Sequence, residues 1–196
     1  MGLIELQKLL AAIYTDAELR ARFRESPQRV AEEWNLSPSD WEQLRQVPGG
    51  QIDEFGDGLI RKRWGHVRDL APLTTRALGD EGLPCFREHA ENFRPRGIKK
   101  HLRDAERFCD AVLQRPELFK RRGTWFRDVV RLEQGWARAT RLTRCCFWRN
   151  LSHLPADLDA HVREGAPIRR RRCAVLWLRW GAGFHLQSRL VQGPRF

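Results

Sequence analysis

Long hydrophobic runs are absent from this sequence. No run approaches the roughly 18–20 apolar residues that a membrane-spanning helix needs. The N-terminus also lacks the basic start, the apolar stretch and the small-residue cleavage site of a signal peptide. We therefore expect a soluble, cytoplasmic protein.

Motifs of catalysis and metal binding are also missing. The five cysteines are an odd number without a C-x-x-C pair, and the six histidines are dispersed, with no H-E-x-x-H. No P-loop, Rossmann fingerprint, nucleophile elbow or kinase signature occurs. We predict no disulfide scaffold, no metal site and no enzymatic activity in this chain. A stand-alone metalloenzyme would need a site assembled from residues far apart in the sequence.

Lysine is scarce, although the chain is strongly basic. The 196 residues include 36 Lys and Arg against 25 Asp and Glu, a formal net charge of +11, and only five of the 36 are lysines. The hydrophobic fraction of 41%, with eight Trp, excludes a disordered polycation. The composition predicts a folded protein that binds anions through arginine.

Capping and turn signals divide residues 1–118 into helices. Thr15 and Glu18 have the spacing of a capping box, and Ser26-Pro27 and Ser37-Pro38 each predict a helix start. Residues 51–70 carry apolar side chains at helical spacing and predict a long amphipathic helix. We therefore expect an N-terminal helical domain over 1–118.

The pattern changes in residues 119–196, which predict a second, smaller domain. A helix over 125–140 precedes strand-like alternation at 142–148, and a helical turn follows at 155–162. An apolar strand over 172–180 continues through a glycine turn at 181–183 into a return strand over 184–190. The predicted fold class is α+β, with a helix and about three antiparallel strands in this domain.

Four basic clusters are candidates for binding, and the cluster at 169–172 leads directly into the predicted hairpin. An exposed edge of a small sheet can take up an extended peptide as an added strand. Arginines beside that edge would hold acidic side chains of the peptide. The same edge could instead be covered by a helix of this chain or by a partner protein.

The order of the segments resembles the small partner proteins of multinuclear non-haem iron oxidases, which modify cysteines in ribosomally made peptides. The resemblance runs over about residues 9–190. It is carried by the opening stretch 9–27 and by NLSP at 35–38, LIRKR at 59–63, VRDLAPLTTRALG at 67–79, DVVRLE at 128–133 and AVLWLR at 174–179. The partner subunit in 3-thiaglutamate (pearlin) biosynthesis is of this type.

This resemblance implies a non-catalytic subunit that forms a heterodimer with the oxidase and recruits the leader of a precursor peptide. The iron would belong to the oxidase, and this chain would need no cofactor. The helical domain would dock on the oxidase, with Trp34, Trp41 and Trp64 as the expected contacts. The C-terminal domain would act as the peptide-recognition element, and the expected leader contacts are Arg171, Arg172, Val175, Trp177 and Arg179.

A nucleic-acid-binding protein is the alternative. The sequence pI of about 10.4 and the arginine clusters are typical of such proteins, and some relatives of the resembling family are described as DNA-binding. Against it, the basic clusters are spread along the chain rather than gathered on one helix.

Overall fold

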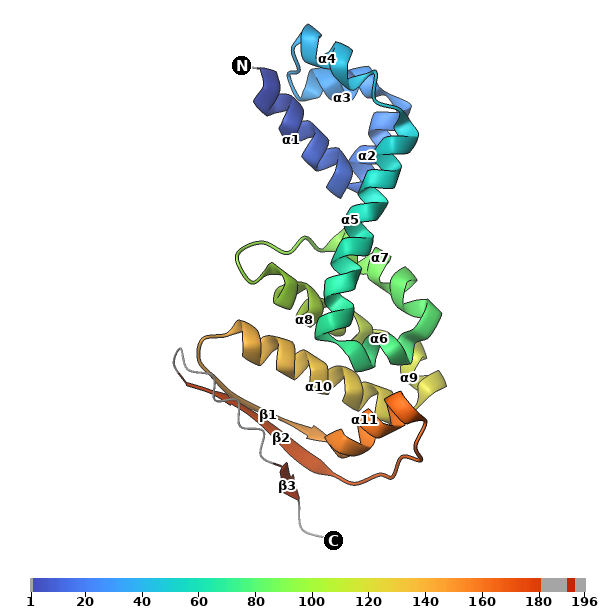
Figure 1. Ribbon diagram of the computed structural model, residues 1–196, viewed down its shortest axis with the longest axis vertical. Coiled ribbons are helices and arrows are strands. Elements are labelled where there is room, and N and C mark those ends of the chain that lie inside the picture. Colours follow the sequence, from blue (N-terminus) through green and yellow to red (C-terminus); the bar gives the residue numbers. More distant parts are fainter. Residues whose placement is uncertain (1, 181–189, 193–196) are drawn as a thin grey trace. The chain divides into compact units, whose positions relative to one another are not determined.

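The computed structural model describes residues 2–180 and 190–192. The predicted glycine turn at 181–183 and the return strand before residue 190 lie outside this range. The fold is α+β, as expected: a mainly helical chain ends in an antiparallel sheet with an accompanying helix (Figure 1). In the part of the chain that the structure describes, no helix is long and apolar enough to cross a membrane.

Two compact units divide the chain, residues 1–62 and 63–196. The first unit holds four helices and the beginning of a fifth: α1 (Gly2–Thr15), α2 (Ala17–Glu25), α3 (Pro27–Glu33), α4 (Pro38–Leu44) and α5 (Gly49–Leu70). Its core is formed by Leu6, Leu9, Ile13, Leu19, Phe23, Val30, Leu44 and Ile52. These buried side chains recur at helical spacing, so each helix turns one apolar face inward.

Two helix starts of the first unit follow the predicted serine–proline signals. Helices α3 and α4 begin at Pro27 and Pro38, and the Ser37 hydroxyl accepts a hydrogen bond from the Asp40 N–H at 3.2 Å. The expected capping box at Thr15 is wrong. Asp16 caps α2 by accepting from the Leu19 N–H, while the Thr15 hydroxyl donates back to the Ala11 carbonyl.

The second unit contains the remaining elements. The helices are the end of α5, α6 (Pro72–Leu78), η1 (Gly79–Glu81), α7 (Gly82–Asn92), α8 (Lys100–Leu113), α9 (Pro116–Arg122), α10 (Thr124–Arg141) and α11 (Pro155–Glu164). The strands are β1 (Cys145–Leu151), β2 (Cys173–Arg179) and β3 (Leu190–Gln192). They form one antiparallel sheet in the order β1-β2-β3.

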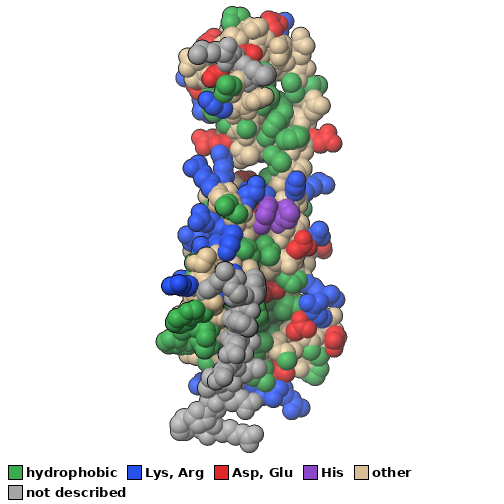
Figure 2. All heavy atoms as spheres, turned by 60° about the vertical axis from the view of Figure 1, so that its left-hand side comes forward, with side chains coloured by type: hydrophobic (Ala, Val, Ile, Leu, Met, Phe, Trp, Pro, Cys, Tyr) green, Lys and Arg blue, Asp and Glu red, His purple; other side chains and the backbone are tan. Residues whose placement is uncertain are grey.

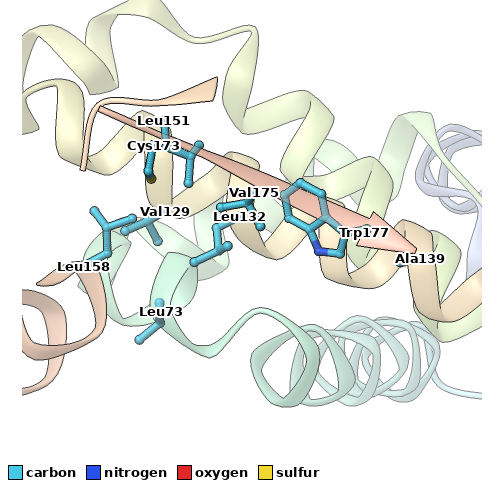
Figure 3. Close-up of a cluster of buried hydrophobic side chains, with 9 residues drawn as sticks. All are labelled: Leu73, Val129, Leu132, Ala139, Leu151, Leu158, Cys173, Val175 and Trp177. Carbon is cyan, nitrogen blue, oxygen red and sulfur yellow. The ribbon is translucent and has the colours of Figure 1, made fainter. Parts of the chain in front are cut away.

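Helix α10 joins the sheet to the helices of this unit. Val129 and Leu132 of α10 pack with Val175 and Trp177 of β2 in a buried cluster that also includes Leu73 of α6 (Figure 3). The ring of Trp177 approaches α10 at Gly135, where a Cβ atom would lie 2.4 Å from the ring carbon Cζ2. Only glycine at 135 therefore lets the sheet pack this closely on α10.

The boundary expected between residues 118 and 119 falls inside the second unit. Helix α10 follows that boundary, yet it packs on α8 and α6, which precede it. The compact units instead divide within α5, between residues 62 and 63. The physical reason is burial, because α10 shares one apolar core with α6 and with the sheet.

Candidate functional site

Among the described strands, β1 forms one edge of the sheet and the three-residue strand β3 forms the other. Strand β2 pairs with β1 along its whole length, and residues 173–175 of β2 also pair with β3. Among the described residues, β1 pairs only with β2, and its other edge carries backbone N–H and C=O groups without a strand partner. A peptide that adds to this sheet as a strand could therefore pair along the whole of β1.

The structure does not bring the five expected peptide contacts to one surface. Val175 and Trp177 are 2% and 0% exposed and belong to the core, so they are not accessible to a peptide. Arg179 donates hydrogen bonds to the carbonyls of Ala139 and Thr140 at the end of α10. Arg171 and Arg172 are exposed, and Arg171 pairs with Asp157 at 2.8 Å.

The three tryptophans expected to meet an oxidase are half-buried within their own units. Trp34 and Trp41 pack against the core of the first unit. Trp64 belongs to the second unit, where its ring lies 5.5 Å from that of Phe86 and 5.7 Å from that of Phe108. Much of the apolar surface of these three tryptophans is therefore already buried within the protein.

A cavity of about 540 Å³ lies among α8, α10 and β1. Five arginines from these three elements line it: Arg103, Arg107, Arg138, Arg141 and Arg149. Arg149 belongs to β1, so the cavity borders the strand that has the open edge. Figure 2 shows Lys and Arg side chains gathered above a cluster of hydrophobic side chains in the lower half of the view.

Helical spacing places these arginines together. On α8, the lining residues 103, 106, 107 and 110 are separated by three or four positions, and so are residues 134, 138 and 141 on α10. Residues at these separations share one helix face. This spacing is readable from the sequence, but only the packing of α8 on α10 shows that the two faces meet.

The excess of positive over negative charge lies in the second unit. Residues 1–62 hold eight Lys and Arg against eleven Asp and Glu, a net charge of −3. Residues 63–196 hold 28 Lys and Arg against 14 acids, a net charge of +14. An anionic ligand would therefore be attracted to the unit that contains the cavity and the open edge.

Two exposed tryptophans lie at the sheet: Trp148 is on β1, and Trp180 directly follows β2. Trp148 and Trp180 are 66% and 77% exposed. In the strand register, Trp148 pairs with Leu176 and Cys146 pairs with Leu178. These two pairs lie on the face of the sheet opposite to the one that carries the inward-facing pair of Phe147 and Trp177. Sequence reasoning missed Trp148 and Trp180, although the alternation of side chains along each strand would have separated them from the core residues.

Buried titratable groups in the second unit have structural partners. The Asp128 carboxylate accepts hydrogen bonds from the Ser152 N–H and from the ring of His153, at 2.7 and 2.8 Å. Burial raises the pKa of the Cys109 thiol well above its usual value and also raises that of Cys173. These thiols therefore stay protonated at neutral pH, and the thiol form is a poor nucleophile.

Among the described residues, no group of three or more His, Cys, Asp and Glu side chains is arranged to hold a metal ion. The second unit does carry an arginine-lined cavity and the edge strand β1. Arginine guanidinium groups bind carboxylates and phosphates, and an open strand binds extended backbone.

No family model and no curated protein matches this chain.

Proposed function

We propose that this protein is a non-catalytic, cytoplasmic partner subunit that binds a multinuclear non-haem iron oxidase. It would recruit the leader of a ribosomally made precursor peptide, so that the oxidase can modify a cysteine of that peptide. The oxidase would carry the iron and the oxidative chemistry. The 3-thiaglutamate pathway is one pathway of this type.

One observation carries the proposal: β1, an edge strand of the described sheet, contributes Arg149 to a cavity lined by arginines. An unpaired strand edge binds extended backbone of any sequence, and arginines beside it favour acidic sequences. A leader peptide rich in Asp and Glu would use both features. The contact strand would be β1, and the inward-facing Val175 and Trp177 would support the sheet from within.

Reconstitution tests this function directly. The genes beside the one for this chain should encode an iron oxidase and a short cysteine-containing precursor. Purified oxidase loaded with iron, incubated in air with the precursor, should change the precursor's mass only when this chain is present. The precursor with its leader removed is the control and should remain unmodified. Equal modification with and without this chain would refute the proposal.

Nucleic-acid binding remains the second candidate, because the second unit has a net charge of +14. Phosphate contacts make such binding steeply dependent on salt. A labelled duplex oligonucleotide that binds tightly, together with the absence of any leader-peptide binding, would favour this candidate over recruitment of a precursor.

A further inference from the structure

The cavity beside β1 contains more arginines than its own carboxylates can neutralise. Arg141 pairs with Glu106 at 2.7 Å, and Arg107 pairs with Asp110 at 3.3 Å. The other three lining arginines, Arg103, Arg138 and Arg149, form no ion pair with a carboxylate among the described residues. These three come from α8, α10 and β1, so they surround the cavity from three elements.

An aromatic contact orients one of these three arginines. The guanidinium carbon of Arg138 lies 5.2 Å from the centre of the Phe147 ring. Phe147 in turn stacks on the buried Trp177, with ring centres 5.3 Å apart and an angle of 18° between the planes. A guanidinium over an aromatic face keeps the N–H groups of its edge available for a carboxylate. The contact with Phe147 therefore positions the Arg138 guanidinium group so that it can bind an acidic ligand.

Strand geometry determines which peptide side chains would reach this cavity. Phe147 and Arg149 are two positions apart on β1, and their partners across the ladder are the buried Trp177 and Val175. They therefore lie on the face of the sheet that is turned toward α10. In a strand added beside β1, alternate side chains would lie on that same face, about 7 Å apart.

We infer that this cavity selects acidic side chains at alternate positions of an extended peptide, and that Arg103, Arg138 and Arg149 are the residues that determine this preference. Two acidic residues separated by one residue would both face the arginines. Two adjacent acidic residues would face opposite sides of the sheet, so only one would reach them. This inference rests on the proposed function and specifies the sequence preference of its peptide site.

Two labelled peptides of identical composition test the preference. Both consist of Thr and Val with two Glu, which are separated by one residue in the first peptide and adjacent in the second. Fluorescence anisotropy with the full chain should give several-fold tighter binding of the first peptide. Because the net charge is the same, nonspecific attraction would bind both equally, and equal binding would overturn the inference.

Single substitutions identify the residues involved. Arg103→Gln and Arg149→Gln should each weaken binding of the first peptide about fivefold, since each removes a charge-assisted contact. Binding of the second peptide should change less. Arg61→Gln is the matched control, because Arg61 is exposed on α5 in the first unit. Arg138→Gln is interpreted only after circular dichroism shows native folding, since Arg138 also contacts Phe147.

The outcomes separate this inference from the proposed function. If the chain supports precursor modification but binds both peptides equally and without dependence on these arginines, the inference is overturned and the recruiting function stands. If the chain supports no modification, the function fails, whatever the peptides do. A duplex oligonucleotide that binds through the same three arginines, when neither peptide binds, would overturn the inference in favour of nucleic acid.

Discussion

Single buried residues in the second unit form contacts that hold distant elements together. Asp104 of α8 is 2% exposed and accepts two hydrogen bonds from Arg63, both at 2.9 Å, and one from His89 at 3.0 Å. Burial alone would raise the pKa of Asp104, but the hydrogen bonds from His89 and Arg63 outweigh it and lower that pKa. The carboxylate is therefore stabilised in its charged form.

We expect Asp104→Asn to lower the free energy of unfolding by about 3–5 kcal/mol at pH 7, because it leaves Arg63 without its buried partner. A carboxyl group with a lowered pKa in the folded state contributes stability above its unfolded pKa and loses it as the pH falls through the folded pKa. The variant should therefore lose less stability on acidification than the original protein. Denaturant unfolding at neutral and acidic pH measures both effects.

Asp159→Asn is the control for Asp104, because it removes an aspartate that pairs with Arg163 where both side chains are 49% exposed. Surface pairs of this kind contribute about 0–1 kcal/mol. Similar losses of stability in the two variants would show that burial of Asp104 does not matter.

Gly135 permits the close contact between α10 and Trp177. Gly135→Ala should destabilise the protein by about 1–3 kcal/mol through overpacking, even though alanine favours a helix. Gly65→Ala in α5 is the control, because no atom lies within 4 Å of the position of its Cβ, and it should be neutral or stabilising. Thermal melting compares the two, and a melting temperature of Gly135→Ala at or above that of Gly65→Ala would contradict the packing argument.

At the scale of elements, helix ends are fixed by residues distant in sequence. The residue before α6 is Ala71, which has no side chain that could cap the helix. The Glu133 carboxylate of α10 accepts the N–H groups of Leu73 and Thr74 instead, both at 2.7 Å. Burial raises the pKa of Glu133, and the hydrogen bonds from Thr74 and Leu73 offset only part of this effect.

Glu133→Gln should weaken the start of α6, since one of the two accepting oxygens becomes an NH₂ group. We expect a loss of about 1–3 kcal/mol, and faster hydrogen exchange at Leu73 and Thr74. A carboxyl group with a raised folded pKa contributes stability below its unfolded pKa and loses it as the pH rises through the folded pKa. The Glu133→Gln variant should not show this loss of stability as the pH rises. Glu91→Gln, at an exposed glutamate of α7, is the control and should leave exchange and pH dependence unchanged.

At the scale of the whole molecule, the two units have separate cores and opposite net charge. The buried cluster of the first unit comes from residues 6–52, and that around Trp177 comes from residues 73–177. The second unit therefore attracts acidic ligands, whereas the first unit has a small net negative charge.

Separate cores predict separate effects of core substitutions. Ile13→Ala should destabilise the first unit by about 2–5 kcal/mol and leave amide protection in α10 and β2 unchanged. Val129→Ala should do the reverse, lowering protection in the second unit only. Hydrogen exchange followed by mass spectrometry resolves the two regions. A loss of protection in both units from either substitution would mean that they unfold as one.

Local signals predicted much of the fold. The serine–proline pairs predicted the starts of α3 and α4, and the apolar spacing predicted α5. The strand-like runs predicted β1 and β2, with β1 shifted toward the C-terminus, to 145–151. These features depend on neighbours in the sequence, which is why they are readable there.

The candidate site was only partly predictable. The sequence predicted a sheet edge beside arginines, but it placed the contacts on β2, where Val175 and Trp177 are in fact buried. Strand order decides which strand is open, and it depends on contacts between residues far apart in the chain. The cavity arginines were missed for the same reason, because they belong to α8, α10 and β1.

The α+β class, the starts of α3 and α4 and the excess of arginine can be read from the sequence, because they follow from local propensity and composition. Contacts between distant residues determine that α10 belongs to the same core as α6, that β1 is an edge strand, and that three elements contribute arginines to one cavity. Burial of Trp177 against Gly135 is the physical reason, because it fixes the inner face of the sheet on α10 and so determines which side chains remain exposed.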